Sequence, residues 1–234
     1  MRFPIPLTVL FVALFTTGAH LAVAAPCNKA TKSHERLVQG RKLTEAGESQ
    51  RAITECFQPV IDSYEKESEK QPTVRRYSAQ NMMQSFVYIA LPVDTGQSVE
   101  VVSGDWADAY LMKAYALVEL RNLPEAQTAL AAAINLSPMN PRYRSELGFT
   151  YQVLKDCDAS IQSYQAAASA AELGSTEESK LEDLGMAWRG EGYCLVEQGK
   201  LDEAEAVYRK ALEANPKDKK SQGELQYVQG LRKK

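Results

Sequence analysis

Paired carboxylates are the first residues that could do chemistry in this sequence of 234 residues. Glu177-Glu178 and Glu182-Asp183 are adjacent pairs, and two carboxyl groups can act as general acid and base when burial separates their pKa values. Both pairs lie in polar sequence typical of a helix start, where acidic side chains stabilise the positive end of the helix dipole. We therefore interpret them as solvated charges and not as a catalytic pair.

Nucleophile and base arrangements have equally little support. Histidine occurs only at His20 and His34, so Ser145 and Ser160 have no neighbouring imidazole in the sequence that could act as a general base. An enzyme needs several polar groups that converge on one site, and residues 71–104 supply only isolated acids. We expect neither catalysis nor a cofactor or metal site in this chain.

The charge composition argues against nucleic acid as a partner. The chain has 27 Lys and Arg against 30 Asp and Glu, and its net charge of −3 provides no basic field for phosphate backbones or anionic lipid. Hydrophobic residues make up 44% and charged residues 24%, a balance typical of globular proteins. We expect a folded protein with no nucleic-acid partner.

The first 25 residues have the order of a secretory signal peptide. Arg2 supplies a positive charge, an apolar run spans Leu7 to Phe15, and residues 22–25 form an A-x-A cleavage signal. The apolar run is too short to span a bilayer comfortably, although an uncleaved N-terminal anchor is the alternative. We predict cleavage after Ala24 or Ala25, export to the periplasm of a bacterial host or secretion from another host, and no membrane insertion after cleavage.

Export would place the four cysteines in an oxidising compartment. They are Cys27, Cys56, Cys157 and Cys194, and none forms a C-x-x-C motif that would indicate a redox or zinc role. An even number of cysteines allows three disulfide pairings, and four free thiols are the alternative. We predict the most local pairing, Cys27 with Cys56 and Cys157 with Cys194.

Small residues recur along the chain with a fixed period. Ala114 precedes Gly148 by 34 residues, and Gly148 precedes Gly192 by 44, which is the same period with an insertion of ten. Twelve and sixteen residues after each small residue, and after Gly40, the sequence holds a second small residue and then a larger one: Ala126 and Leu130, Ser160 and Tyr164, Ala204 and Tyr208, Ala52 and Cys56. Such a period is typical of stacked supersecondary units.

This pattern resembles the tetratricopeptide repeat, a helical hairpin with Trp, Leu-Gly, Tyr, Ala, Phe and Pro at set spacings. The matching positions of the three clearest repeats are Tyr110, Ala114, Leu117, Ala126, Leu130, Ala133 and Pro138; Leu147, Gly148, Tyr151, Ser160 and Tyr164; and Trp188, Gly192, Ala204, Tyr208, Ala211 and Pro216. Ser33 to Lys66 forms a degenerate repeat, because Pro59 stands where a small helical residue is expected.

The resemblance implies an all-α fold, an α-solenoid of stacked helix-turn-helix repeats. The expected segments are a signal peptide (1–25), a degenerate hairpin (26–70), an insertion with one helix (71–104), three repeats over 105–216 (about 107–140, 141–174 and 185–218), and a capping helix with a basic tail (217–234). Within the insertion, residues 98–103 are either a short strand or an irregular link.

An aromatic residue directly follows the small residue of each clear repeat: Tyr115, Phe149 and Tyr193. The resemblance implies that this position faces the concave groove, together with Leu111, Val118, Gln152 and Val196, with Arg41 at one end. Aromatic side chains are common at protein-binding hot spots. The alternative is that the 71–104 insertion covers the aromatic residues and fills the groove.

The resemblance therefore implies an interaction scaffold or adaptor that binds a partner protein or an extended peptide in its groove. Family members that hold a chaperone's C-terminal carboxylate use Asn and Lys there, and the aromatic residues of this chain argue against such a clamp. The alternative function is an accessory or regulatory subunit of an envelope enzyme, or part of a secretion or toxin-neutralising system. Self-association through an open end of the array is a third alternative.

Overall fold

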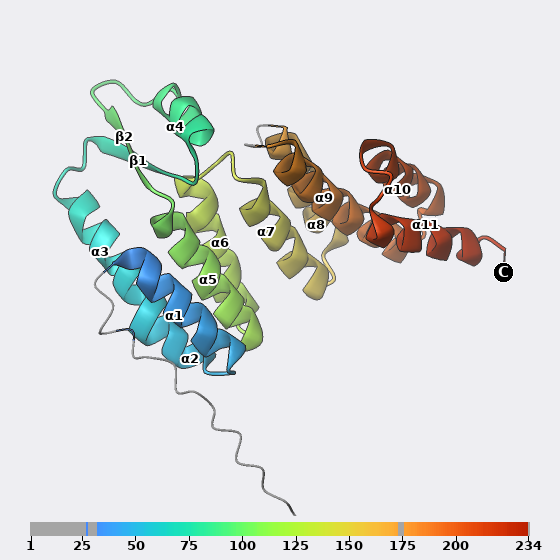
Figure 1. Ribbon diagram of the computed structural model, residues 1–234, viewed down its shortest axis with the longest axis horizontal. Helices are drawn as coiled ribbons and strands as arrows, with labels where there is room; N and C mark the ends of the chain where they lie inside the picture. The colour runs from blue at the N-terminus through green and yellow to red at the C-terminus, as the bar shows by residue number, and fades with distance from the viewer. Residues whose placement is uncertain (1–26, 28–31, 173–175, 234) are drawn as a thin grey trace, which may run out of the picture.

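The structure is a computed structural model that describes Cys27 and residues 32–172 and 176–233. Its helices stand side by side in an elongated array that runs from the N-terminal hairpin to the last helix near the C-terminus (Figure 1). The predicted all-α solenoid is thereby confirmed. The predicted signal peptide, residues 1–25, lies outside the described residues. Within the part of the chain that the structure describes, no helix is both long and apolar enough to cross a membrane.

Three helical hairpins form the regular part of the array. They are α5 (Asp105–Glu119) with α6 (Leu123–Leu136), α7 (Pro141–Val153) with α8 (Cys157–Ala171), and α9 (Glu177–Glu197) with α10 (Leu201–Ala214). The second helices of two hairpins end just before Pro138 and Pro216, because proline cannot donate the backbone hydrogen bond that would continue the helix.

The turn inside each hairpin has the same backbone conformation. One residue in each turn has a positive φ, between 61° and 79°: Gly47, Arg121, Lys155 and Gly199. The amide of Gly199 donates to the carbonyl of Val196 at 2.9 Å, and the next amide, of Lys200, donates to the carbonyl of Leu195 at 2.9 Å. This pair of bonds satisfies the carbonyls at the end of the first helix and reverses the chain. The fourth such turn, at Gly47, shows that the degenerate N-terminal hairpin is built on the same plan.

Glycines let aromatic rings lie directly against neighbouring helices. A Cβ atom at Gly148 would lie 3.0 Å from the ring of Tyr164, and one at Gly190 would overlap that same ring. A Cβ at Gly192 of α9 would overlap the ring of Tyr208, on the second helix of the same hairpin. Tyr164, on α8, therefore contacts both α7 and α9, and it joins two repeats.

The N-terminal hairpin departs from the regular spacing. Its first helix is α1 (Ser33–Glu45), and the second is a continuous run of α2 (Ser49–Arg51), the π-helix η2 (Ala52–Phe57) and α3 (Gln58–Glu69). The π-helix takes up one extra residue. As a result, the ring that lies over Gly40 belongs to Phe57, seventeen residues on, and not to the position sixteen residues on.

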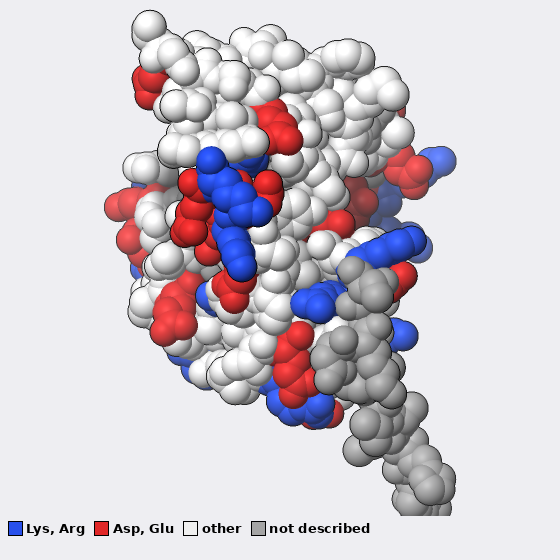
Figure 2. Space-filling model, turned by 90° about the vertical axis from the view of Figure 1, so that its left-hand side faces the viewer, with Lys and Arg blue, Asp and Glu red and all other residues white. Residues whose placement is uncertain are grey.

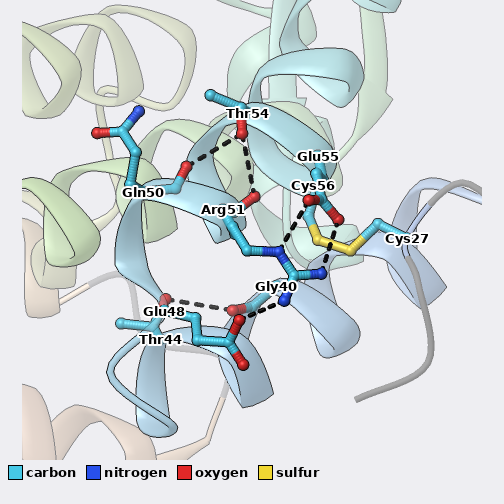
Figure 3. Close-up of a disulfide and its surroundings, with 9 residues drawn as sticks. All are labelled: Cys27, Gly40, Thr44, Glu48, Gln50, Arg51, Thr54, Glu55 and Cys56. Carbon is cyan, nitrogen blue, oxygen red and sulfur yellow. Dashed lines mark hydrogen bonds and ion pairs between the residues drawn. A yellow bond between two sulfur atoms is a disulfide. The ribbon is translucent and has the colours of Figure 1, made fainter. Parts of the chain in front are cut away.

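Because of this shift, Cys56 is not the large residue that packs on Gly40, as its spacing of sixteen residues predicted. The side chain is fully buried and forms a disulfide with Cys27, as predicted (Figure 3). Arg51 holds the same stretch from the outer side through ion pairs with Glu48 and Glu55. The disulfide therefore fixes Cys27 to the π-helix.

The insertion contains two strands as well as the expected helix. In order they are β1 (Val74–Ala79), α4 (Met82–Ile89) and β2 (Ser98–Ser103), and the strands pair in parallel from Val74 with Ser98 to Ala79 with Ser103. The structure thus decides for a strand over residues 98–103, and it adds a partner strand that we did not expect. Arg76 is buried in β1 because Glu100 pairs with its guanidinium at 2.7 Å.

The last helix, α11 (Lys219–Leu231), covers the open end of the array. Its Val228 is fully buried against Leu195 and Tyr208 of the last hairpin, as expected for a capping helix. Asp218 accepts hydrogen bonds from the backbone at the start of α11 and forms an ion pair with Arg189 of α9.

Candidate functional site

The first helices of neighbouring hairpins build the candidate site. Arg41 of α1, Leu111 and Tyr115 of α5, and Arg142 of α7 line one pocket of about 350 Å³. The structure therefore brings together three residues that the sequence assigned to the groove. Arg142 was not among them, because its place on α7 does not carry the aromatic signal that marked the other positions.

Phe149 and Tyr193 occupy the equivalent positions, directly after the small residue, in the first helices of the next two hairpins. Their side chains are 44% and 45% exposed, so the 71–104 insertion does not cover them. Tyr115 differs, because it is half-buried and hydrogen-bonded. The three aromatic residues thus do not form a uniform stripe: the two in the C-terminal repeats are free to contact a partner, whereas Tyr115 is a fixed wall of the pocket.

The hydrogen bonds of Tyr115 explain its fixed position. Its hydroxyl donates to Glu146 Oε1 at 2.7 Å and accepts from Arg142 Nε at 3.3 Å. Burial raises the pKa of the Glu146 carboxyl, while the bond from Tyr115 and the charge of Arg142 oppose that shift. The Arg142 guanidinium is therefore held at the pocket by groups of α5 and α7.

A second polar chain lies beside the first. The Tyr143 hydroxyl donates to Asp108 Oδ1 at 2.9 Å and accepts from Gln80 Nε2 at 2.9 Å. Burial raises the pKa of Asp108 above its ordinary value, against the opposing hydrogen bonds. This chain joins the insertion, through Gln80, to the helices that form the pocket.

Asp183 corrects one interpretation from the sequence. The sequence indicates solvated charge for the Glu182-Asp183 pair, but Asp183 is partly buried, and burial raises its pKa to about 6. The neighbouring Glu182 adds to this shift, and Arg142 opposes it. A sequence of polar residues at a helix start gives no signal for this burial, because it arises from packing between repeats.

Leu111, which also borders the pocket, and the remaining predicted groove residues have packing roles. Leu111 is only 3% exposed, and Val118 and Val196 are partly buried against core clusters. Gln152 accepts a hydrogen bond from the Tyr164 hydroxyl at 3.1 Å and donates to the Gly190 carbonyl at 3.0 Å. Gln152 therefore holds α7 against α9, and its amide is already bonded within the protein.

Cys157 and Cys194 are free thiols in the structure, so the predicted second disulfide is not formed there. The two thiols are hydrogen-bonded to each other, and burial raises the pKa of Cys157 to about 12. Within the described residues, no group of three or more His, Cys, Asp and Glu side chains could hold a metal ion.

Comparisons with known proteins identify the repeats. Residues 111–177 and 185–218 match tetratricopeptide repeat families. No curated protein matches the chain significantly. One similar solved structure is the first TPR of Spaghetti (RPAP3) bound to HSP90 peptide SRMEEVD, with 18% identity, 55% of this chain and 96% of that chain covered, and a TM-score of 0.47.

Two further structures are similar over more of the chain. MamA AMB-1 has 16% identity over 86% of this chain and 82% of its own, with a TM-score of 0.46. A thermophilic TPR protein of Thermus thermophilus, TTC0263, has 18% identity over 84% of this chain and 98% of its own, with a TM-score of 0.43. Together with the hairpins, turns and ring-on-glycine contacts described above, the family matches show that residues 111–177 and 185–218 of this chain are tetratricopeptide repeats.

Proposed function

We propose that this protein is an exported interaction scaffold that binds a partner protein or an extended peptide in the groove of its repeat array. The observation that carries this proposal is the exposure of Phe149 and Tyr193 on the first helices of successive repeats. Large aromatic side chains on a rigid surface bury much area on binding with little loss of conformational entropy.

The pocket at the N-terminal end of the groove adds polarity to this surface. Arg41 and Arg142 line it together with the acidic Glu45 and Asp108, beside the apolar side chains of Leu111 and Phe57, and Arg41 pairs with Glu45 at 3.8 Å. A partner segment would therefore bury apolar side chains against Phe149 and Tyr193 and place a polar group in this pocket of mixed charge. Charges of this kind set the orientation of a bound segment more than its affinity.

Two observations support export. Residues 1–25 have the order of a signal peptide. Cys27, the first cysteine of the sequence, forms a disulfide with Cys56, and such bonds persist mainly in oxidising compartments. Mass spectrometry of the protein recovered from its host tests export directly: we expect a chain that begins at Ala25 or Pro26 and carries one intact disulfide. A chain that retains residues 1–24 in the reducing interior of the cell would contradict export.

The groove is tested by partner capture with the double variant Phe149→Ala/Tyr193→Ala. Both side chains are exposed, so we expect the helical circular-dichroism signal to stay unchanged while the affinity for the captured partner falls at least about tenfold. Tyr115 is left intact, because its removal would also disturb the Glu146 and Arg142 contacts.

The matched control is Leu154→Ala, which removes an exposed apolar side chain at the α7–α8 turn, outside the first-helix surface. Partners are captured on immobilised protein from the exporting compartment and identified by mass spectrometry, and the affinity of each is then measured in purified form. Partners that bind the wild type, the control and the double variant equally would show that the groove is not the binding surface.

A further inference from the structure

The outward face of α4 is an unpartnered apolar surface. Met82, Met83, Phe86 and Ile89 are 73%, 54%, 63% and 60% exposed, and their spacing places them on one side of the helix. We call these four residues the α4 face. Among the described residues, no other helix has as many exposed large hydrophobic side chains. Isolated exposed apolar residues are normal on protein surfaces, but a contiguous cluster marks an interaction site.

The opposite side of α4 is firmly anchored. Tyr88 is fully buried, and its hydroxyl lies 2.8 Å from Ser137 Oγ and accepts a hydrogen bond from the Met139 amide at 3.3 Å. Asn81 caps the helix by accepting from the Gln84 amide at 2.9 Å. Because these contacts fix the rotation of α4, the four apolar side chains cannot turn inward to reach the core.

The charges around α4 restrict what can cover it. Residues 77–112 contain no Lys or Arg, whereas Asp94, Glu100, Asp105 and Asp108 lie in the same stretch. The upper part of the surface in Figure 2, where the insertion stands in Figure 1, is almost free of blue. The arginines nearest to the buried side of α4 are already bonded within the protein: Arg144 donates to the Pro138 carbonyl, and Arg75 donates to Asn135. An anionic lipid surface or an acidic peptide would find no Lys or Arg on the α4 face itself, and binding to either relies on such residues.

A second copy of the same chain fits this surface better. The α4 face itself carries no charged residue, so two identical faces can meet about a two-fold axis without like-charge repulsion. The exposed parts of its four side chains amount to roughly 500 Å² per copy, so these side chains would bury at most about 1,000 Å² in a symmetric pair, below the range of stable specific interfaces and in the range of weak, transient ones.

We propose that the α4 face is a self-association surface and that two copies of this protein pair α4 against α4 about a two-fold axis. The small area makes the dimer weak, with a dissociation constant on the order of micromolar. The pairing uses no residue of the groove, so it would join two grooves into one bivalent particle.

Sedimentation of the purified protein tests this pairing over about 1 to 300 μM, the range in which a micromolar dimer dissociates. We expect the wild type to pass from monomer to dimer. Phe86→Glu should weaken the dimer at least about tenfold, because it places a carboxylate in the apolar centre of the interface. The matched control Leu154→Glu adds the same charge at an exposed apolar residue far along the chain and should leave the dimer unchanged.

A charge-exchange experiment identifies the partner as a second α4. Phe86→Glu and Phe86→Lys should each dimerise at least about tenfold more weakly than the wild type when alone, and an equal mixture should dimerise more strongly than either, as a pair with one chain of each kind. A wild type that stays monomeric at every concentration, a Phe86→Glu variant that dimerises like the wild type, or an equal loss in Leu154→Glu would overturn the proposal. Binding of monomeric wild type to phosphatidylcholine vesicles, lost in Phe86→Glu, would also overturn it and assign the face to a lipid surface.

Discussion

The N-terminal hairpin and the regular hairpins both pack an aromatic ring against a glycine, but the number of residues between the glycine and the ring differs. In the regular part, Tyr164 lies over Gly148 and Tyr208 over Gly192, each sixteen residues after the glycine. In the N-terminal hairpin, Phe57 lies over Gly40 after seventeen residues, because the π-helix takes up the additional one. What both hairpins require is a ring packed against a glycine, and the helix adjusts its own geometry to supply it.

The two regions also differ in what holds them. A hairpin within the array buries surface against neighbours on both sides, whereas a terminal one has a neighbour on one side only. At the C-terminal end, α11 supplies the missing neighbour. At the N-terminal end, the disulfide between Cys27 and Cys56 ties the chain to the helix instead (Figure 3). The N-terminal end of the array is thus held by a covalent bond, and the C-terminal end is held by the packing of a capping helix.

Tyr164→Ala should have the largest effect on stability, because it removes the ring that packs on glycines in the regular hairpins. The ring contacts both α7 and α9, so its removal leaves a cavity at two helix interfaces and should lower the free energy of unfolding by about 3–5 kcal/mol. Urea unfolding measures the loss. Hydrogen exchange should show α9 and α10 opening separately from the helices before them, because the contact between repeats is lost.

The matched control for this ring is Tyr164→Phe, which removes only the hydroxyl bond to Gln152 and should lower the free energy of unfolding by about 1 kcal/mol. A Tyr164→Ala variant no less stable than Tyr164→Phe would show that the ring does not join the repeats.

A smaller and more local effect is expected when the disulfide is removed by the double change Cys27→Ser/Cys56→Ala. The bond closes a loop between residues 29 apart, and its loss should lower the free energy of unfolding by about 3–4 kcal/mol. Hydrogen exchange should accelerate in α1–α3 and stay unchanged in α9 and α10. Cys157→Ser, which removes no disulfide, is the control; uniform loosening of the whole array would contradict the local role of the bond.

The smallest expected effect is the pH dependence of stability, which has opposite signs for Glu55 in the N-terminal hairpin and Asp183 in the array. In the N-terminal hairpin, the hydrogen bond from Arg51 lowers the pKa of Glu55, so its stabilising contribution is lost as the pH falls through that lowered pKa. Asp183 in the array behaves oppositely. Burial raises its pKa to about 6 from an ordinary 3.8, so the folded state binds more protons between these values and loses stability as the pH rises from 3.8 to about 6.

Asp183→Asn should therefore stabilise the protein at pH 7 by about 1 kcal/mol, a value reduced from the full shift because solvent reaches part of the carboxylate. At about pH 3.5 the variant and the wild type should be nearly equally stable, because the aspartate is then largely protonated in both the folded and the unfolded state. Urea unfolding at the two pH values measures the difference, and an equal difference at both would exclude titration of Asp183 as its source.

Much of the fold follows from local features of the sequence. The recurrence of small residues from Ala114 to Gly192 predicted the hairpins and their stacking, because helix geometry places these positions at the closest approach of two helices. Pro138 and Pro216 predicted the helix ends for the same local reason. The disulfide of Cys27 with Cys56 was also predicted correctly from proximity in the sequence.

The candidate site was predicted less completely. The spacing marked Tyr115, Phe149 and Tyr193 as equivalent positions, but only the structure shows that the hydroxyl of Tyr115 is bonded to Glu146 while the other two side chains are exposed. Arg142 joins the pocket through contacts that cross from one repeat to the next, and such contacts have no signature within a single repeat.

The sequence by itself determined the positions of the regular repeats and the sixteen-residue spacing between each small residue and the ring that packs on it, because these depend on neighbours within one hairpin. Only the tertiary structure decided the remaining features: the π-helix that moves Phe57 over Gly40, the pairing of β1 with β2, and the burial of Asp183. These depend on how separate segments share space, since burial and strand pairing are set by residues far apart in the chain.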